Sequence, residues 1–227
     1  MNWLAHVFLS EQKIDFQIGN FLADPLKGRL WDDASSDMKN GMRIHKIIDS
    51  YTDSHEIVSF SKKRLREKGL LKPVIIDLTY DYFLTKNWDD FCKTSIDLFS
   101  KEFYENANQR IPFLPNNTNM YLSNMINRDL LNKYHNLDQL KTSFERMDLR
   151  LSERLRQRET AISYFDSVLE NLDDLEEDFL NFFPQLCEKV KDNLMSNLNY
   201  IMNYLGRFKK KTKFNYLFNG KIKQENS

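Results

Sequence analysis

Apolar side chains recur at three- and four-residue steps along most of this chain, which is the spacing of residues that share one face of an α-helix. A short apolar segment over residues 2–10 is followed by a second one over residues 16–23, and Pro25 and Gly28 interrupt the pattern after it. The pattern therefore predicts two short helices that end before a turn.

Two longer helices are predicted next. The short polar side chains of residues 35–37 (Ser-Ser-Asp) are typical caps of a helix N-terminus, and they precede a periodic segment over residues 38–60. Pro73 suits the first turn of a further helix that runs to about residue 87.

The second half of the chain contains an expected loop and a long amphipathic segment. Residues 111–120 (IPFLPNNTNM) are expected to form a loop, because two prolines and three asparagines interrupt any period. From Tyr164 onward an apolar stripe indicates a helix face that belongs to the core, formed by Leu169, Leu172, Leu175, Phe179, Phe182, Phe183 and Leu186. After Pro184 the pattern can continue as a helix, and about the last twenty residues, which are basic with scattered aromatic residues, are expected to form a partly disordered tail.

Glycine and proline are scarce in this sequence. The chain has 6 glycines and 5 prolines among 227 residues, about 5% together where about 12% is usual. Few residues are available for turns, so we expect an all-α fold, a helical bundle with a basic C-terminal tail. The length suits one domain with an appendage, and we place a helical domain at residues 1–190 and a helical extension with the tail at residues 191–227.

Charge and cysteine content narrow the class of protein. Lysine plus arginine equals aspartate plus glutamate at 33 each, which argues against a protein whose whole surface matches nucleic acid. Cys92 and Cys187 lie far apart without metal-ligand spacing, so we expect no disulfide framework and a reducing compartment. The N-terminus lacks the basic segment of a signal peptide, and no stretch reaches the roughly 18 apolar residues that cross a bilayer. We therefore expect a soluble, cytoplasmic protein with no membrane span.

The candidate chemistry lies in the first third of the chain, where histidines and aspartates recur at four-residue spacing. Such spacing stacks side chains on one helix face, and it relates His45, Asp49 and Asp53, then Asp77 and Asp81, with His6 and Asp24 upstream. Imidazole and carboxylate groups together bind borderline divalent ions such as Mn²⁺, Fe²⁺ or Zn²⁺ and leave positions open for water. The pattern indicates a hydrolase in which a divalent ion activates water against a phosphoester.

Each of these residues also has a plainer interpretation. An aspartate such as Asp49 or Asp53, taken alone, is typical of a solvated helix face. His6 lies in an apolar segment, where a histidine is more often a core residue than a ligand. The metal site therefore depends on the whole constellation.

Four motifs, in this order and at these separations, resemble the acyl carrier protein phosphodiesterase family: MNWLAH at residues 1–6, IGNFLAD at 18–24, GMRIHKIIDSYTD at 41–53 and DLTYDYFLTKNW at 77–88. The likeness covers residues 1–186 and includes FFPQL at its end. Members of this family are similar to HD-domain phosphohydrolases, so the resemblance implies an HD-domain-like helical bundle.

The resemblance implies a cytosolic hydrolase that removes 4′-phosphopantetheine from holo-acyl carrier protein and leaves the apo-protein, usually with Mn²⁺. Carried over by motif, the implied metal ligands are His6, Asp24, His45, Asp49, Asp77 and Asp81. The candidate catalytic residues among them are Asp24, His45, Asp49 and Asp81. Asn2, Asn20 and Asp53 lie one helical turn from members of the set, close enough to orient them.

The sequence departs from the family pattern at one position. Where the family pattern is Asp-His-Phe-Leu, this chain has Asp81-Tyr82-Phe83-Leu84, so a histidine that could bind metal or donate a proton is missing. Tyrosine can donate a hydrogen bond to a phosphoryl oxygen, but its pKa of about 10 makes it a poor acid at neutral pH. Either the histidine is dispensable, or this chain is a divergent, slower or inactive member.

Acyl carrier proteins are small and acidic, so the resemblance also implies basic residues around the site. The candidates are Lys62, Lys63, Arg64 and Arg66, which follow the helix of His45, and a second group that includes Arg150 and Arg154. Ordinary solvated helix faces explain either group equally well.

Three alternatives remain open at this point. The same site could hydrolyse a nucleotide or another small phosphoester. The chain could instead be a carrier-protein-binding module with weakened or lost catalysis. A purely structural helical protein would require the spacing of histidines and aspartates to be a coincidence.

Overall fold

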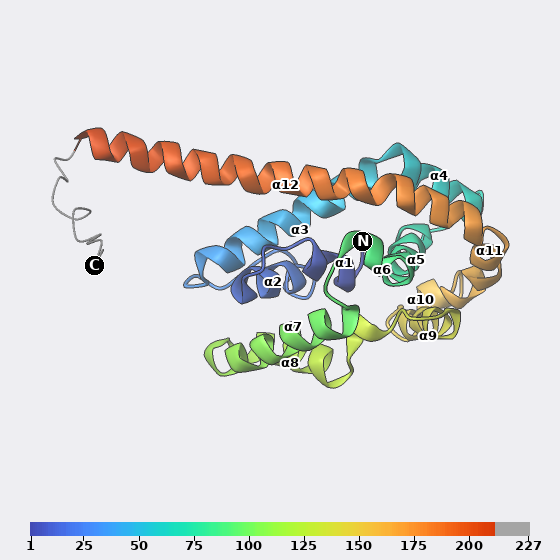
Figure 1. The fold of residues 1–227 in the computed structure, drawn as a ribbon. Coiled ribbons are helices and arrows are strands. Elements are labelled where there is room, and N and C mark those ends of the chain that lie inside the picture. Colours follow the sequence, from blue (N-terminus) through green and yellow to red (C-terminus); the bar gives the residue numbers. More distant parts are fainter. Residues whose placement is uncertain (212–227) are drawn as a thin grey trace, which may run out of the picture. The chain divides into compact units, whose positions relative to one another are not determined.

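The computed structural model of this chain describes the backbone of residues 1–211 and the side chains of residues 1–195. All regular structure in this part of the chain is helical, which confirms the predicted all-α class (Figure 1). The chain divides into two units, residues 1–190 and residues 191–227. Residues 212–227, which contain most of the expected tail, lie outside the described residues.

The first unit contains most of the helices. It begins with α1 (Trp3–Phe8), α2 (Ile14–Phe21), α3 (Ser36–Ser54), α4 (Glu56–Leu65), α5 (Lys72–Lys86), α6 (Trp88–Phe91) and α7 (Ile96–Arg110). It continues with η1 (Ile111–Phe113), α8 (Asn116–Asn127), η2 (Leu130–Asn132), α9 (Leu137–Asp148), α10 (Glu153–Arg156), η3 (Ile162–Tyr164) and α11 (Phe165–Glu170). The last helix, α12 (Leu172–Lys211), starts in the first unit and ends in the second, and it continues through Pro184 as predicted. Within the described residues, no helix has the length and apolar character needed to cross a membrane.

Two of the secondary-structure predictions were wrong. The helix expected over residues 38–60 is two helices, because His55 adopts an extended conformation (ψ 135°) and its side chain accepts a hydrogen bond from the backbone N–H of Ile57, which caps α4. The segment expected to be a loop is largely helical, because Pro115 precedes the first turn of α8 and the asparagines continue that helix. Ser35, by contrast, caps α3 as predicted and accepts from the backbone N–H of Met38.

The apolar stripe of α12 forms much of the core of the first unit. Phe179, Phe182 and Phe183 are fully buried. Phe179 packs edge-on against Tyr80 of α5 and lies beside Phe83 of the same helix. The stripe was thus predicted correctly as core at these positions, although Leu169 at its start is 40% exposed.

Two glycines hold α2 and α3 in backbone contact. A Cβ atom on Gly19 would lie 2.1 Å from the carbonyl oxygen of Met38, and one on Gly41 would lie 2.0 Å from the carbonyl oxygen of Phe16. Only a residue without a side chain fits at either position. The close approach brings Asn20 of α2 within hydrogen-bonding distance of His45 of α3.

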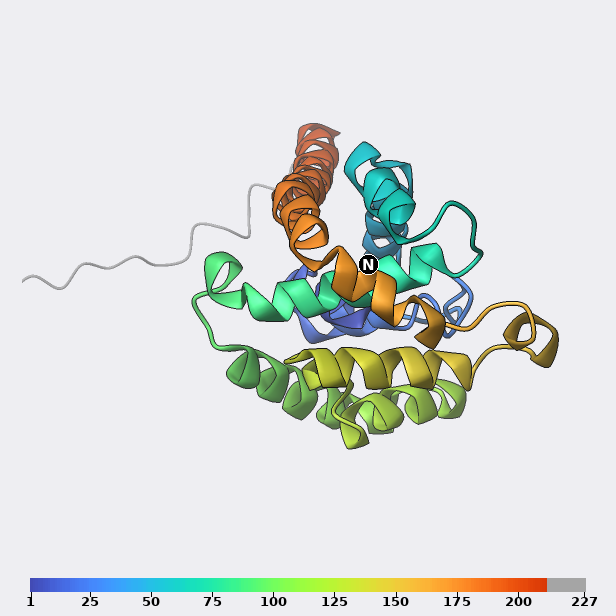
Figure 2. The same cartoon turned by 90° about the vertical axis from the view of Figure 1, so that its right-hand side faces the viewer.

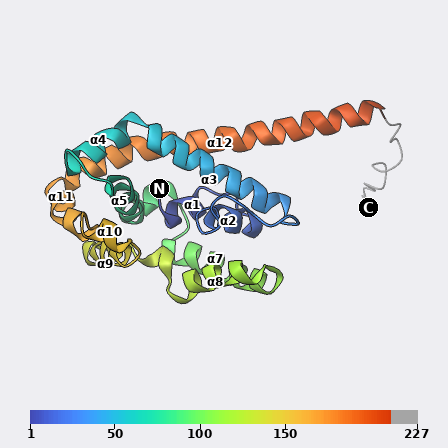
Figure 3. The ribbon, with the colours of Figure 1, turned by 180° about the vertical axis from the view of Figure 1, so that it is seen from behind.

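The helix α1 is short and lies between α2 and α5, as the front and back views both indicate (Figures 1 and 3). Helices α7, α8 and α9 gather on one side of these three (Figures 1 and 2). The candidate site therefore forms where α1, α2 and α3 meet, with α5 and α9 nearby.

Candidate metal centre

Two buried histidines and one aspartate meet at the junction of α1 and α3. His6, His45 and Asp49 each offer a ligand atom, and these atoms all lie within 4.8 Å of one another. The Nε2 atom of His6 lies 3.1 Å from Oδ1 of Asp49, and the Nε2 atom of His45 lies 3.0 Å from Oδ2 of the same carboxylate. The two imidazole rings stack with centroids 4.0 Å apart. Both histidines are buried whereas the side chain of Asp49 is 40% exposed, so the cluster opens toward solvent on its carboxylate side.

The side chain of Asn20 on α2 orients both histidine rings. Its Nδ2 group donates to the backbone carbonyl of His6 at 2.8 Å and to the hydroxyl of Ser10 at 2.9 Å. Because a carbonyl oxygen can only accept, this contact fixes which end of the amide is nitrogen. The Oδ1 atom of Asn20 then lies 2.9 Å from Nδ1 of His6 and 3.1 Å from Nδ1 of His45. Both Nδ1 atoms must carry hydrogens and donate to this shared oxygen.

When the ring of His6 carries one hydrogen, that hydrogen is on Nδ1, so Nε2 has none to donate although it faces acceptors. It lies 3.1 Å from the backbone carbonyl of Met1 and 3.1 Å from Asp49. Burial lowers the pKa of His6, which favours a neutral ring with a single hydrogen. A neutral ring cannot donate from both nitrogens. The lone pair of Nε2 and the oxygen atoms around it therefore repel one another unless a positive group binds to them. A divalent cation satisfies that need, and two imidazoles with a carboxylate form a donor set that borderline divalent ions accept.

The charges of the cluster are strongly coupled. Burial works against charge on His45, but hydrogen bonds to Asp24 and Asp49 outweigh it and raise the pKa of His45 to about 9. Burial also works against charge on Asp49, but the hydrogen bond from the charged His45 holds the pKa of Asp49 well below the ordinary value. Without a cation, the cluster thus keeps a charged His45 beside an ionised Asp49 at neutral pH.

Asp24 lies at the edge of the cluster rather than within it. Its Oδ1 atom is 3.1 Å from Nε2 of His45, and its side chain is 72% exposed. The hydrogen bond from His45 lowers the pKa of Asp24, so its carboxylate is ionised at neutral pH. Asp24 also lines the cavity described below, which makes it the link between the cluster and that cavity.

Asp77 and Asp81 of α5 face the start of α1 instead of the histidines. Asp81 is fully buried and accepts from the backbone N–H groups of Leu4 at 2.9 Å and Ala5 at 3.4 Å. It caps α1 in place of Asn2, whose side chain makes no capping bond. Burial raises the pKa of Asp81 to about 7. Asp77 accepts from the amino group of Met1 at 2.8 Å, so the structure does not bring these two predicted ligands into the cluster.

Among the residues expected to orient ligands, Asn20 contacts both histidines, whereas the other two have different partners. Asn2 donates to the hydroxyl of Tyr134 at 2.5 Å, and Asp53 forms an exposed ion pair with Lys62 at 3.1 Å. Ser10, which donates to the carbonyl of His6, was missed by the sequence reasoning. Its position four residues after His6 on the same short segment was the available signal.

Tyr82, which replaces the expected histidine, lies outside the cluster. It is buried beside Phe83, and the charged groups that affect its pKa are Lys86 and Glu176. The departure from the family pattern therefore removes none of the groups that meet at His6, His45 and Asp49.

The predicted basic residues differ in their surroundings. Arg64 pairs with Asp174 and Asp178. Arg66 stacks on the ring of Tyr164, and Lys63 lies over the ring of Phe60. Of the second group, Arg150 lines the cavity that Asp24 also lines, whereas Arg154 does not. Their role toward a partner stays a prediction.

The sequence of this chain is similar to a protein family and to individual proteins of known name. The family model described as acyl carrier protein phosphodiesterase matches residues 1–186. Relatives named acyl carrier protein phosphodiesterase include a Photorhabdus laumondii protein, 26% identical over 195 residues, which cover 85% of this chain and 96% of the relative. A Klebsiella pneumoniae protein is 27% identical over 85% of this chain and 98% of its own length, and an Escherichia coli protein is 28% identical over 84% and 97%. The search of solved structures found no match, so the likeness to HD-domain phosphohydrolases stays a prediction.

Proposed function

This chain belongs to the acyl carrier protein phosphodiesterase family, and we propose that it hydrolyses the phosphodiester that joins 4′-phosphopantetheine to holo-acyl carrier protein. The products would be apo-acyl carrier protein and free 4′-phosphopantetheine. We further propose that the reaction needs a divalent cation, with Mn²⁺ as the first choice, held by His6, His45 and Asp49. The two free cysteines suit a reducing compartment, and we propose the cytoplasm.

One observation carries the metal proposal: Asn20 directs the Nδ1 hydrogens of both histidines toward itself and leaves both Nε2 atoms facing carboxylates. Carboxylate and imidazole groups in this arrangement favour a cation, and the shared amide supplies the orientation that metal-binding histidines usually obtain from a neighbouring acceptor. When bound, such a cation would lower the pKa of a water molecule and offset charge on the phosphoryl group.

The chain's own residues have separate tasks in this proposal. Asp24 is the most exposed carboxylate beside the cluster and is ionised, so we assign it to orient the attacking water molecule through a hydrogen bond. Asn20 keeps both rings in the orientation in which Nε2 is available. Asp81 has a positioning task, because it fixes the N-terminus of the helix that carries His6. The water oxygen forms the new bond to phosphorus and releases a proton to solvent, while the bond between phosphorus and the serine oxygen of the carrier protein breaks and that oxygen takes up a proton from solvent.

Mass spectrometry of holo-acyl carrier protein tests the proposal. Incubation with this protein and Mn²⁺ should convert the holo-protein to the apo-protein, with loss of the 4′-phosphopantetheine mass. His45→Ala and Asp49→Asn should lower the rate by at least about a hundredfold, because each removes a ligand.

Asp53→Asn is the matched control, since Asp53 lies on the same helix one turn beyond Asp49 but pairs with Lys62. The control should keep the wild-type rate. Full activity in His45→Ala would exclude the proposed site, and release from simple phosphodiesters at the same rate as from holo-carrier protein would favour the small-phosphoester alternative.

A further inference from the structure

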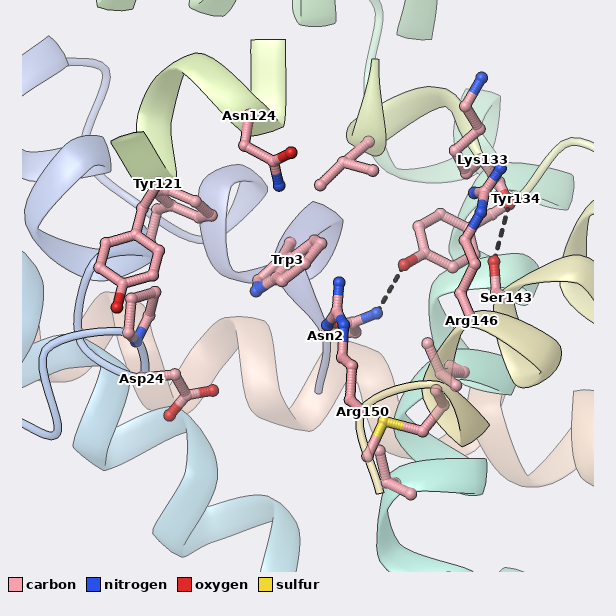
Figure 4. Close-up of a pocket in the computed structure, with 16 residues that line it drawn as sticks. Asn2, Trp3, Asp24, Tyr121, Asn124, Lys133, Tyr134, Ser143, Arg146 and Arg150 are labelled. Atoms are coloured by element: carbon pink, nitrogen blue, oxygen red, sulfur yellow. Dashed lines mark hydrogen bonds between the residues drawn. The ribbon is translucent and has the colours of Figure 1, made fainter. Parts of the chain in front are cut away.

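A cavity of about 510 Å³ lies beside the cluster, within the size range of roughly 300–1,000 Å³ that is usual for pockets enclosing small molecules. Asp24 stands at one side of it, and Asn2 and Trp3 from the start of α1 form part of its wall (Figure 4). The chain segment that carries His6 thus also contributes to the cavity. A ligand group that reaches Asp24 from this cavity lies next to the carboxylate that contacts Nε2 of His45.

The cavity has a marked charge imbalance. Asp24 is the acidic residue in its lining, whereas Lys133, Arg146 and Arg150 are all cationic. Within the described part of the chain, none of these three cations forms an ion pair with a carboxylate. Three cations and one carboxylate give the cavity lining a net positive charge, so the cavity favours an anionic ligand.

The arginines are positioned by helix periodicity. Ser143, Arg146 and Met147 lie on one side of α9, and Arg150 lies in the turn that follows this helix. Leu140 and Phe144 are buried on the adjoining face of α9, so this helix is anchored in the core beside the cavity. Arg150 reaches toward Asn2 and Trp3 in the middle of the cavity (Figure 4), and its guanidinium carbon lies 5.2 Å from the centre of the Trp3 ring.

The rest of the cavity wall suits a neutral, partly apolar chain. Phe21, Val74, Leu78 and Met147 supply apolar surface. Polar groups are present as well, because the hydroxyl of Tyr134 is held by Asn2 and its surroundings include both Arg146 and Arg150. A ligand with an anionic end and an uncharged arm that carries amides matches both parts of the wall.

We propose that this cavity binds the 4′-phosphopantetheine arm, with Arg150 holding the phosphoryl group next to Asp24 and the apolar wall holding the pantetheine part. Arg146 adds positive charge at the same wall. The inference rests on the proposed function, and it assigns to Arg150 a direct contact with the substrate that is separate from the histidine cluster.

Calorimetric titration with free 4′-phosphopantetheine tests this proposal in the presence of a chelator, so that neither a cation nor hydrolysis is needed. Pantetheine, which lacks the phosphate, and inorganic phosphate are the comparison ligands. Wild-type protein should bind 4′-phosphopantetheine more tightly than either of them. Arg150→Gln should lower that affinity about tenfold or more, to the level of pantetheine, because the variant loses the charge-assisted hydrogen bonds from the guanidinium to the phosphate.

Arg128→Gln is the control, since Arg128 is an exposed arginine at the end of α8 that does not line the cavity. It should leave all three affinities unchanged. The proposal is overturned if wild-type protein binds 4′-phosphopantetheine no better than pantetheine, or if Arg150→Gln keeps the full affinity.

Hydrolysis of holo-carrier protein by the same variants separates this proposal from the proposed function. A raised KM in Arg150→Gln supports the cavity assignment. Rapid hydrolysis with an unchanged KM in Arg150→Gln would overturn it while the proposed function stands. Binding of 4′-phosphopantetheine that depends on Arg150, without any hydrolysis by wild-type protein, would support the cavity assignment and count against the proposed function.

Discussion

The raised pKa of His45 predicts how the stability of the cation-free protein depends on pH. The folded protein holds a proton on His45 with a pKa of about 9, whereas the ordinary pKa of histidine is 6.5. Between these values the folded state binds more protons than the unfolded state, so the contribution to stability is complete below about pH 6.5 and is lost as the pH rises through 9. The difference between the two pKa values corresponds to a loss of at most about 3 kcal/mol, because Asp24 is exposed and salt screens its interaction with His45.

Asp24→Asn is the perturbation that isolates this effect, because the hydrogen bond to Asp24 is the largest of the interactions that raise the pKa of His45. The variant should lose less stability than wild-type protein between about pH 6 and about pH 9.5. The amino group of Met1, whose pKa is also raised because its attraction to Asp77 outweighs its burial, titrates in the same range. Its contribution cancels when the two profiles are subtracted.

Urea unfolding followed by circular dichroism, with a chelator present, gives the free energy of unfolding at each pH. Asp53→Asn serves as the control and should follow the wild-type profile, since Asp53 contacts Lys62 rather than the histidines. Parallel profiles for wild-type protein and Asp24→Asn would refute the reasoning, because they would mean that Asp24 does not stabilise the charged form of His45.

Three further predictions concern the surroundings of the cluster. Gly41→Ala should lower the free energy of unfolding by about 3 kcal/mol or more in urea titrations, because its Cβ would lie 2.0 Å from the carbonyl oxygen of Phe16. Asn20→Ala should weaken Mn²⁺ binding in calorimetry by roughly 10- to 100-fold although all ligands remain, and unchanged affinity would contradict the role of Asn20. Tyr82→His should change kcat/KM for holo-carrier protein by less than about threefold, because residue 82 lies outside the cluster; a larger gain would show that the family histidine acts there.

Much of the fold and part of the site could be predicted from local patterns. The scarcity of glycine and proline and the helical periodicity indicated the all-α class, and four-residue spacing placed His45 and Asp49 on one face of α3. Spacing specifies which residues share a face but not what that face meets. Asp77 and Asp81 have the same spacing, yet their face meets the N-terminus of α1, where backbone N–H groups need acceptors.

Tertiary contacts explain the features that the sequence reasoning missed. The break at His55 depends on a side chain that caps the following helix, which periodicity does not reveal. The lining of the cavity combines residues from α1, α5, α8 and α9, which are far apart in the chain. Arg146 had a usable signal, since it precedes Arg150 by one turn, but nothing in the sequence indicated that both would share a wall with Trp3.

The amide of Asn20 takes its orientation from the main-chain carbonyl of His6, and this has a consequence for how the protein can evolve. A main-chain carbonyl is present whatever side chain a mutation introduces. Substitutions at residue 6 or among the surrounding ligands would therefore leave the direction of the amide unchanged. The donor set can diversify, and a lineage can exchange one ligand for another, without first having to rebuild the group that aligns them.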